Sequence, residues 1–226
     1  MRAKKAARRG CKRKKRYRHM GLLNLLINDP VTFFLLAVPL LYSIIIHELA
    51  HGWVAFRMGD PTAKLAGRLT WNPLKHLDPI GTIMLFIFGF GWAKPVPVNF
   101  GYIEQTRKGL VLISSAGIVA NFFLAFFSFA IYRVLSPPPS SPAGQVIFYM
   151  AQINIILASF NLIPIPPLDG SKILMGVSSE RFQNALSRLE PYGFFIIIGL
   201  LYTGVLDPVI KFFRFLILAL IRVLLP

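Results

Sequence analysis

Two histidines and a glutamate near residue 50 have the types and the spacing needed to bind and use a metal ion. His47 and His51 are four residues apart, so on a helix their side chains share one face and can hold one ion. Zinc held by two imidazoles and one oxygen ligand keeps a position open for water, whose pKa drops to about 7. Glu48, next to the first histidine, can then take the proton. The pattern predicts a zinc hydrolase.

The third zinc ligand must come from another part of the chain. Asp169 is one of the few ionisable residues in the apolar regions, and it follows a proline-rich helix break at residues 164–167. It could instead cap the helix that begins after it. In another kind of membrane zinc protease a glutamate would be the third ligand. The candidates for that alternative lie in polar connections: Glu104, Glu180 and Glu190.

Two further polar residues have less specific surroundings. Asn121 lies deep in an apolar segment, where its amide must find partners. Helix packing and a hydrogen bond to the substrate backbone or to an oxyanion explain it equally well. His76 lies in a charged loop without a partner at ligand spacing, so we expect a solvated histidine there.

A transporter or another metal-binding membrane protein is the competing function, because intramembrane ionisable residues are expected there too. That alternative gives no role to Glu48, which stands beside two metal ligands. Each polar group in hydrocarbon costs on the order of several kcal/mol unless it is paired. The His-Glu-His group therefore favours a bound metal and hydrolysis.

The composition places this site in a membrane protein. Of the 226 residues, 55% are hydrophobic and 15% charged, and the mean hydropathy is +0.60. Four segments approach the length that spans a bilayer, and a fifth, Pro208–Pro226, either crosses the membrane or lies along its surface. We therefore expect an all-α polytopic membrane protein with four to five transmembrane helices. The four segments are Val31–Ile46, which continues to Met58, Gly109–Tyr132, Gln145–Ile163 and Tyr192–Leu206.

The segment near residues 80–101 is apolar at first but too short to cross the membrane comfortably. Ile80–Trp92 contains three glycines, and Lys94–Val98 alternates like a strand, with prolines that confine it to a sheet edge. An edge of this kind can receive a peptide strand. We expect a short re-entrant or β-hairpin-like segment here.

Three separated motifs together resemble those of the site-2 protease family of intramembrane zinc metalloproteases, in the type found in small bacterial members. They are His47-Glu-Leu-Ala-His51, Gly117-Ile-Val-Ala-Asn121, and the segment from Asn161 to Gly170, which reads Asn-Leu-Ile-Pro-Ile-Pro-Pro-Leu-Asp-Gly. They occur in the order of the family, and the resemblance covers roughly residues 21–206.

The resemblance implies one zinc ion per chain, held by His47, His51 and Asp169, and water activated by Glu48. It also implies that Asn121 steadies the substrate, that Asn161 supports the same site, and that the region of Val96 and Val98 pairs with an unwound substrate. The expected partners are membrane-embedded proteins or peptides and the lipid bilayer, with no specific nucleic acid.

The charge distribution predicts an orientation. In the family, the histidine end of the first span faces the cytoplasm. With that orientation, the ten basic residues within 57–108 and 172–188 lie on the cytoplasmic side of a bacterial cell membrane, in agreement with the positive-inside rule. Residues 1–19 carry eleven more and would lie outside, against that rule. We expect 1–19 to be a basic, disordered tail, and we hypothesise that translation starts at Met20, before a protease domain at 20–226.

Overall fold

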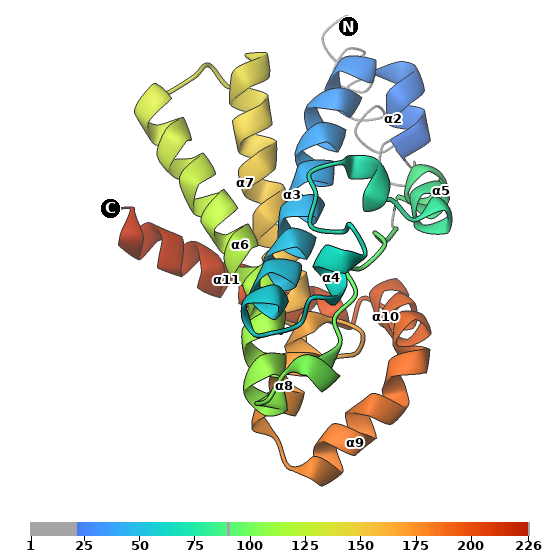
Figure 1. The fold of residues 1–226 in the computed structure, drawn as a ribbon. Helices are drawn as coiled ribbons and strands as arrows, with labels where there is room; N and C mark the ends of the chain where they lie inside the picture. The colour runs from blue at the N-terminus through green and yellow to red at the C-terminus, as the bar shows by residue number, and fades with distance from the viewer. Residues whose placement is uncertain (1–21, 90, 226) are drawn as a thin grey trace, which may run out of the picture.

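The regular structure is helical throughout the part of the chain that the computed structural model describes, residues 22–89 and 91–225 (Figure 1). This confirms the predicted all-α class. The basic tail at residues 1–19 and the start at Met20 lie outside the described residues. Four segments are long and apolar enough to cross a membrane, so the chain is a multi-pass membrane protein. They are Pro30–Arg57, Thr106–Leu135, Pro142–Asn161 and Glu180–Tyr202.

The first span is helix α3 (Pro30–Arg57), which carries both histidines of the first motif. It starts at a defined cap, because the Asp29 side chain accepts a hydrogen bond from the Thr32 N–H at 3.1 Å and Pro30 occupies the first turn. A shorter helix, α2 (Leu22–Asn28), packs against it. At about 1.5 Å per residue, α3 is long enough to cross hydrocarbon and still project beyond it.

Helix α6 (Thr106–Leu135) is the centre of the bundle, since it packs against α3, α7 (Pro142–Asn161) and α8 (Asp169–Val177). Helices α6 and α7 form an antiparallel pair joined by a proline-rich turn (Figure 1). The end of α7 at Asn161 precedes the prolines of residues 164–167, and the chain then turns directly into α8. These contacts bring the second half of α3 and the start of α8 to the same side of α6.

The C-terminal third consists of shorter helices: α9 (Glu180–Leu189), η4 (Glu190–Tyr192), α10 (Gly193–Tyr202) and α11 (Leu206–Leu224). The fourth candidate span therefore starts earlier than predicted and ends at Tyr202, just before Gly204, whose φ is +74°. Helix α11 is not among the candidate spans. It packs Ile217 and Ile221 against residues of α6 and α7.

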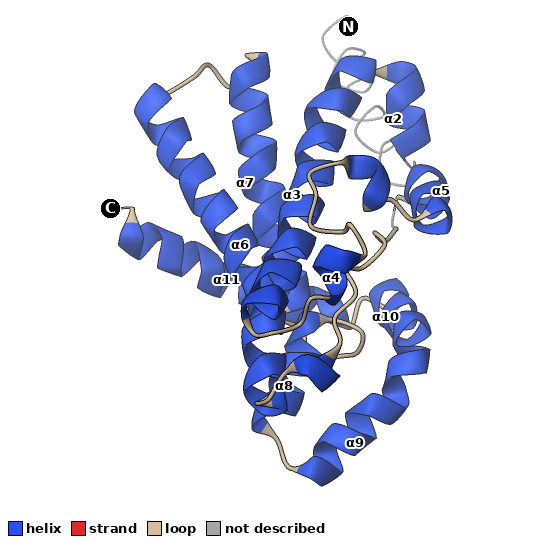
Figure 2. Ribbon diagram, in the orientation of Figure 1, coloured by secondary structure: helices blue, strands red, loops and turns tan. Residues whose placement is uncertain are grey.

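The prediction of a β-hairpin-like segment near residues 80–101 is wrong. The first part forms helix α5 (Pro79–Phe88), and Figure 2 shows loop rather than strand after it. The one isolated β-bridge among the described residues joins Leu77 to Ala93 in antiparallel fashion. Pro95 and Pro97 have no N–H to donate, so a regular ladder cannot form along the edge of this segment that these two residues face. Short helical turns flank it: α4 (Thr62–Leu65), η2 (Pro73–Lys75) and η3 (Phe100–Tyr102).

Candidate metal centre

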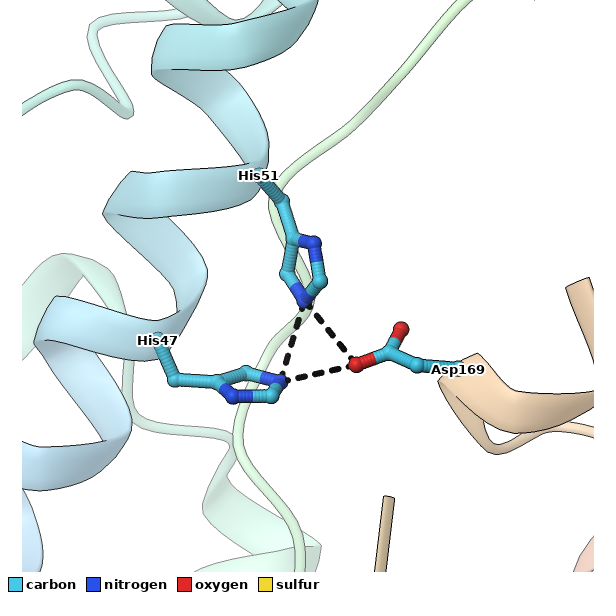
Figure 3. A group of neighbouring side chains, drawn as sticks. All are labelled: His47, His51 and Asp169. Atoms are coloured by element: carbon cyan, nitrogen blue, oxygen red, sulfur yellow. Dashed lines mark hydrogen bonds and ion pairs between the residues drawn. The ribbon is translucent and has the colours of Figure 1, made fainter. Parts of the chain in front are cut away.

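Three side chains from two helices converge on one point between α3 and α8 (Figure 3). His47 Nε2 and His51 Nε2 are 3.0 Å apart, and each lies 3.2 Å from Asp169 Oδ2. The side chains of the three residues are about nine-tenths buried. The structure thus brings together the two histidines and the aspartate of the predicted ligand set, although Asp169 lies 118 positions after His51.

The outer nitrogen of each imidazole contacts an oxygen that accepts hydrogen bonds. His51 Nδ1 lies 2.6 Å from the carbonyl oxygen of Ile113, and His47 Nδ1 lies 2.5 Å from Asn121 Oδ1. Nδ1 must carry the proton in both rings to make these bonds, so both Nε2 atoms present lone pairs to the centre. A second hydrogen-bonded partner of this kind is what metal-binding histidines have in other proteins.

The centre therefore has the donor set that a cation requires. Two lone pairs and a carboxylate oxygen face one another with no hydrogen between them, and Asp169 Oδ2 receives no hydrogen bond from any described residue. Ligand atoms in a tetrahedral zinc site lie about 3.3 Å from one another, given bonds of about 2.0–2.1 Å. The observed separations of 3.0–3.2 Å fit this size.

Asp169 is the first residue of α8. The alternative ligands Glu104, Glu180 and Glu190 are exposed, and none belongs to the cluster.

Gly117 of α6 provides the space in which the histidine rings lie. A Cβ atom at this position would be 2.5 Å from His47 Cε1 and 2.6 Å from His47 Nδ1, far inside van der Waals contact. The absence of a side chain therefore lets α6 approach the face of α3 that carries His47 and His51.

Glu48 points to the extended segment that follows α5. Its Oε2 accepts a hydrogen bond of 2.8 Å from the N–H of Val96. The Val96 side chain is buried and Val98 is half buried, packed near Ala55 and Ile113. The structure thus joins the predicted base to the predicted substrate-binding region, through a backbone contact rather than through a valine side chain.

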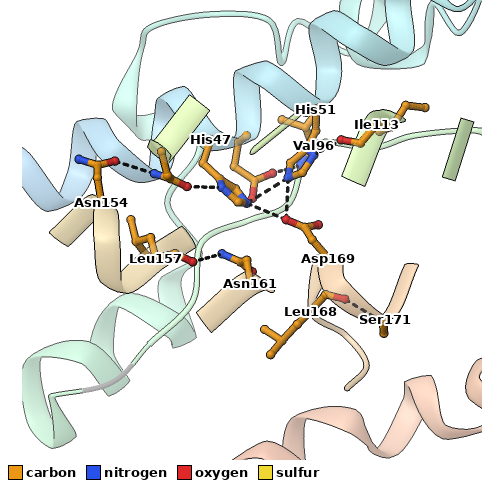
Figure 4. A network of polar contacts seen from close by, with 12 residues as sticks. His47, His51, Val96, Ile113, Asn154, Leu157, Asn161, Leu168, Asp169 and Ser171 are labelled. Atoms are coloured by element: carbon orange, nitrogen blue, oxygen red, sulfur yellow. Dashed lines mark hydrogen bonds and ion pairs between the residues drawn. The ribbon is translucent and has the colours of Figure 1, made fainter. Parts of the chain in front are cut away.

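Asn121 and Asn161 differ in their relation to the centre. Asn121 is fully buried on the Nδ1 side of His47, and its amide nitrogen donates to Asn154 Oδ1 at 2.6 Å. Its side-chain oxygen thus contacts the ring nitrogen of His47 opposite the one that faces Asp169. Asn161, which Figure 4 shows near Asp169, donates from Nδ2 to the carbonyl of Leu157 within its own helix.

The expectation of a solvated His76 is wrong, because this side chain is 1% exposed and its Nε2 lies 2.8 Å from the carbonyl of Thr70. Sequence reasoning also missed two contributors to the centre. The Ile113 carbonyl belongs to the backbone and has no sequence signal. Asn154 had the same signal as Asn121, an amide within an apolar segment, and could have been found by it.

Comparisons with known proteins find a matching family and several similar proteins. The model of peptidase family M50 matches residues 35–140 and 139–202. YwhC of Bacillus subtilis strain 168 is 41% identical over 175 residues, covering 74% of this chain and 80% of YwhC. Rip2 of Mycolicibacterium smegmatis is 29% identical over 183 residues, covering 77% of this chain and 69% of Rip2. No solved structure gives a significant match.

Proposed function

The chain belongs to peptidase family M50, the site-2 protease family of membrane zinc metalloproteases, and on that premise we propose that it hydrolyses peptide bonds of transmembrane substrates within the bilayer. In this proposal His47, His51 and Asp169 hold one zinc ion per chain. Glu48 is the general base. The observation that supports it most directly is the convergence of two imidazole nitrogens and a carboxylate oxygen at separations of 3.0–3.2 Å.

The bound zinc ion would supply a Lewis acid that polarises the scissile carbonyl and lowers the pKa of water to about 7. Glu48 accepts the proton that the attacking water gives up and then delivers it to the leaving nitrogen. One of its carboxylate oxygens accepts the Val96 N–H, which holds the side chain in place, and the other oxygen has lone pairs available for the proton. The protease proposal therefore gives Glu48 a role, which the transporter alternative does not.

The segment Lys94–Asn99 is where the substrate would bind. In an extended chain Val96 and Val98 present their backbone groups to the same edge. Val96 uses its N–H on Glu48, whereas the N–H of Val98 donates to no described residue. A substrate strand that pairs with Val98 would therefore run past Glu48, and a helical substrate would have to unwind first. Asn161, at the end of α7, supports the same site.

Replacing Glu48 with glutamine tests this mechanism. The amide keeps the shape of the side chain but cannot take a proton, so we expect Glu48→Gln to retain about one zinc per chain. Cleavage of a reconstituted transmembrane peptide should fall by about 10²–10⁴-fold. Glu104→Gln, a change at an exposed glutamate, is the matched control and should leave both values unchanged. Cleavage by Glu48→Gln at the rate of the control would reject Glu48 as the base.

A further inference from the structure

A line of buried polar side chains connects α7 to the zinc ligand His47. Asn154 Oδ1 accepts a hydrogen bond of 2.6 Å from Asn121 Nδ2, and Asn121 Oδ1 in turn lies 2.5 Å from His47 Nδ1. Asn154 and Asn121 are both 0% exposed. Figure 4 shows Asn154 at one end of this line of contacts and His47 at the other. The line therefore links a helix without metal ligands to the centre.

The side-chain amide of Asn154, on α7, can take only one orientation. Asn154 Nδ2 lies 2.8 Å from the main-chain carbonyl oxygen of Met150, which can accept a hydrogen bond but cannot donate one. The second proton of the amide has Ser43 Oγ, also at 2.8 Å, as its acceptor. The nitrogen of the Asn154 amide must face Met150, and its oxygen must face Asn121.

Each following step is then determined by the previous one. An oxygen on Asn154 requires the nitrogen of the Asn121 amide to face it, so the Asn121 oxygen faces His47. That oxygen accepts, so His47 Nδ1 must carry the ring proton. Its Nε2 then has a free lone pair, directed to Asp169 and His51.

We propose that Asn154 is a positioning residue that sets the tautomer of His47 through Asn121. Without the oxygen of Asn154, the Asn121 amide can rotate and offer its nitrogen to His47 Nδ1. The ring proton would then move to Nε2, where it blocks coordination. This inference rests on the proposed zinc site and assigns a function to a residue that does not touch the metal.

The burial of the network argues against simple packing. An amide in an apolar helix interior costs free energy unless all its groups are paired, and a leucine of similar size would fill the same space without that requirement. In Asn154 the oxygen and both amide protons have partners, from α6, α7 and α3 respectively. The side chain of Asn154 thus bonds to groups of three helices, and its oxygen orients Asn121, which contacts His47.

Zinc affinity of the purified, metal-free chain in detergent tests the proposal, measured by competition with a chromophoric chelator. Asn154→Leu removes the oxygen and should weaken zinc binding by about 10–100-fold. Asn154→Asp keeps an oxygen toward Asn121 whether or not the carboxyl is protonated, so its affinity should stay within about threefold of the original chain. Ser159→Ala is the matched control, since Ser159 is equally buried on α7 but bonds only to Ile155 of its own helix.

Equal zinc affinity of Asn154→Leu and Ser159→Ala would overturn the proposal. Equal losses in Asn154→Leu and Asn154→Asp would overturn it too, because a packing role does not distinguish an apolar side chain from one that keeps the oxygen. If Asn154→Leu does not fold, a loss in Asn154→Asp overturns the proposal and retention supports it. Failure of the original chain to bind zinc would instead reject the zinc site itself, so the two failures are distinguishable.

Discussion

Single residues decide whether the two imidazoles can meet at one point. The rings of His47 and His51 lie against the backbone of α6 at Gly117, where there is no side chain to push them apart. Because protein interiors are closely packed, one added methyl group at this contact cannot be absorbed without moving a ring.

We therefore expect Gly117→Ala to displace the histidine rings and to weaken zinc binding by about 10-fold or more, a size comparable to the loss of a ligand's hydrogen-bonded partner. Alanine is the better helix former, so the helix itself should not suffer. Zinc retained after dialysis against a chelator measures the effect. Gly199→Ala is the control, because a Cβ at Gly199 of α10 would meet nothing within 4 Å. Equal zinc content in the two variants would contradict this account of Gly117.

At this scale the sequence predicted which candidate ligands come together better than it predicted the residues around them. The spacing of His47 and His51 on one helical face identified the pair, and Asp169 stood out as a carboxylate after a helix break. The contact of Asn121 with His47 Nδ1 depends on how α6 packs against α3. No local pattern contains that information.

At the scale of elements, the segment from Lys94 to Asn99 is held by side chains rather than by a sheet. Glu48 accepts from Val96, Arg68 donates to the carbonyl of Lys94 at 2.7 Å, and Asp60 accepts from the N–H of Asn99 at 2.7 Å. These contacts fix the segment beside the site without a strand partner.

Asp60 makes this arrangement depend on pH. Burial acts to raise the pKa of the Asp60 carboxyl, but hydrogen bonds from Thr62 and Asn99 outweigh burial and lower the pKa below its usual value. The fold therefore favours the charged form. This stabilisation is complete above the ordinary pKa of about 4 and is lost as the pH falls through the lowered value.

Thermal unfolding in detergent should reveal this dependence. The original chain should melt above Asp60→Asn at pH 6, and the difference should shrink as the pH falls from 5 to 3. Asp207→Asn removes one charge at an exposed position and controls for net charge. A difference between the original chain and Asp60→Asn that stays constant over this range would show that the Asp60 contacts do not stabilise the fold through its charge.

The elements differ in how far the sequence could predict them. Long apolar runs predicted α3, α6 and α7 with small errors at the ends, since local composition determines these helices. The segment 94–99 alternates like a strand, but its backbone is hydrogen-bonded by side chains of residues 26–48 positions away in the sequence. Such partners can be known only from the folded chain.

At the scale of the whole molecule, the polar connections divide between two ends of the bundle. The turn between α6 and α7 lies at one end, and α8 and α9 lie at the other (Figure 1). The basic residues of the α8–α9 region, Lys172, Arg181 and Arg188, favour the cytoplasm for that end. We propose that the metal centre lies toward this side.

Cysteine labelling in intact cells tests this orientation. The chain has a single cysteine, Cys11, so Cys11→Ser provides a background without reactive thiols. In that background Ser140→Cys, in the exposed turn between α6 and α7, should react with a membrane-impermeant maleimide. Ser179→Cys, between α8 and α9, should react only after the cells are permeabilised. The reverse pattern would place the metal centre toward the outside.

Crystals of the zinc-loaded chain, measured at the zinc absorption edge, would show whether His47, His51 and Asp169 hold the ion. We expect one anomalous peak per chain, about 2.0–2.2 Å from His47 Nε2, His51 Nε2 and a carboxylate oxygen of Asp169. A peak bound by other residues, or no peak between α3 and α8 in a chain that carries zinc, would contradict the account.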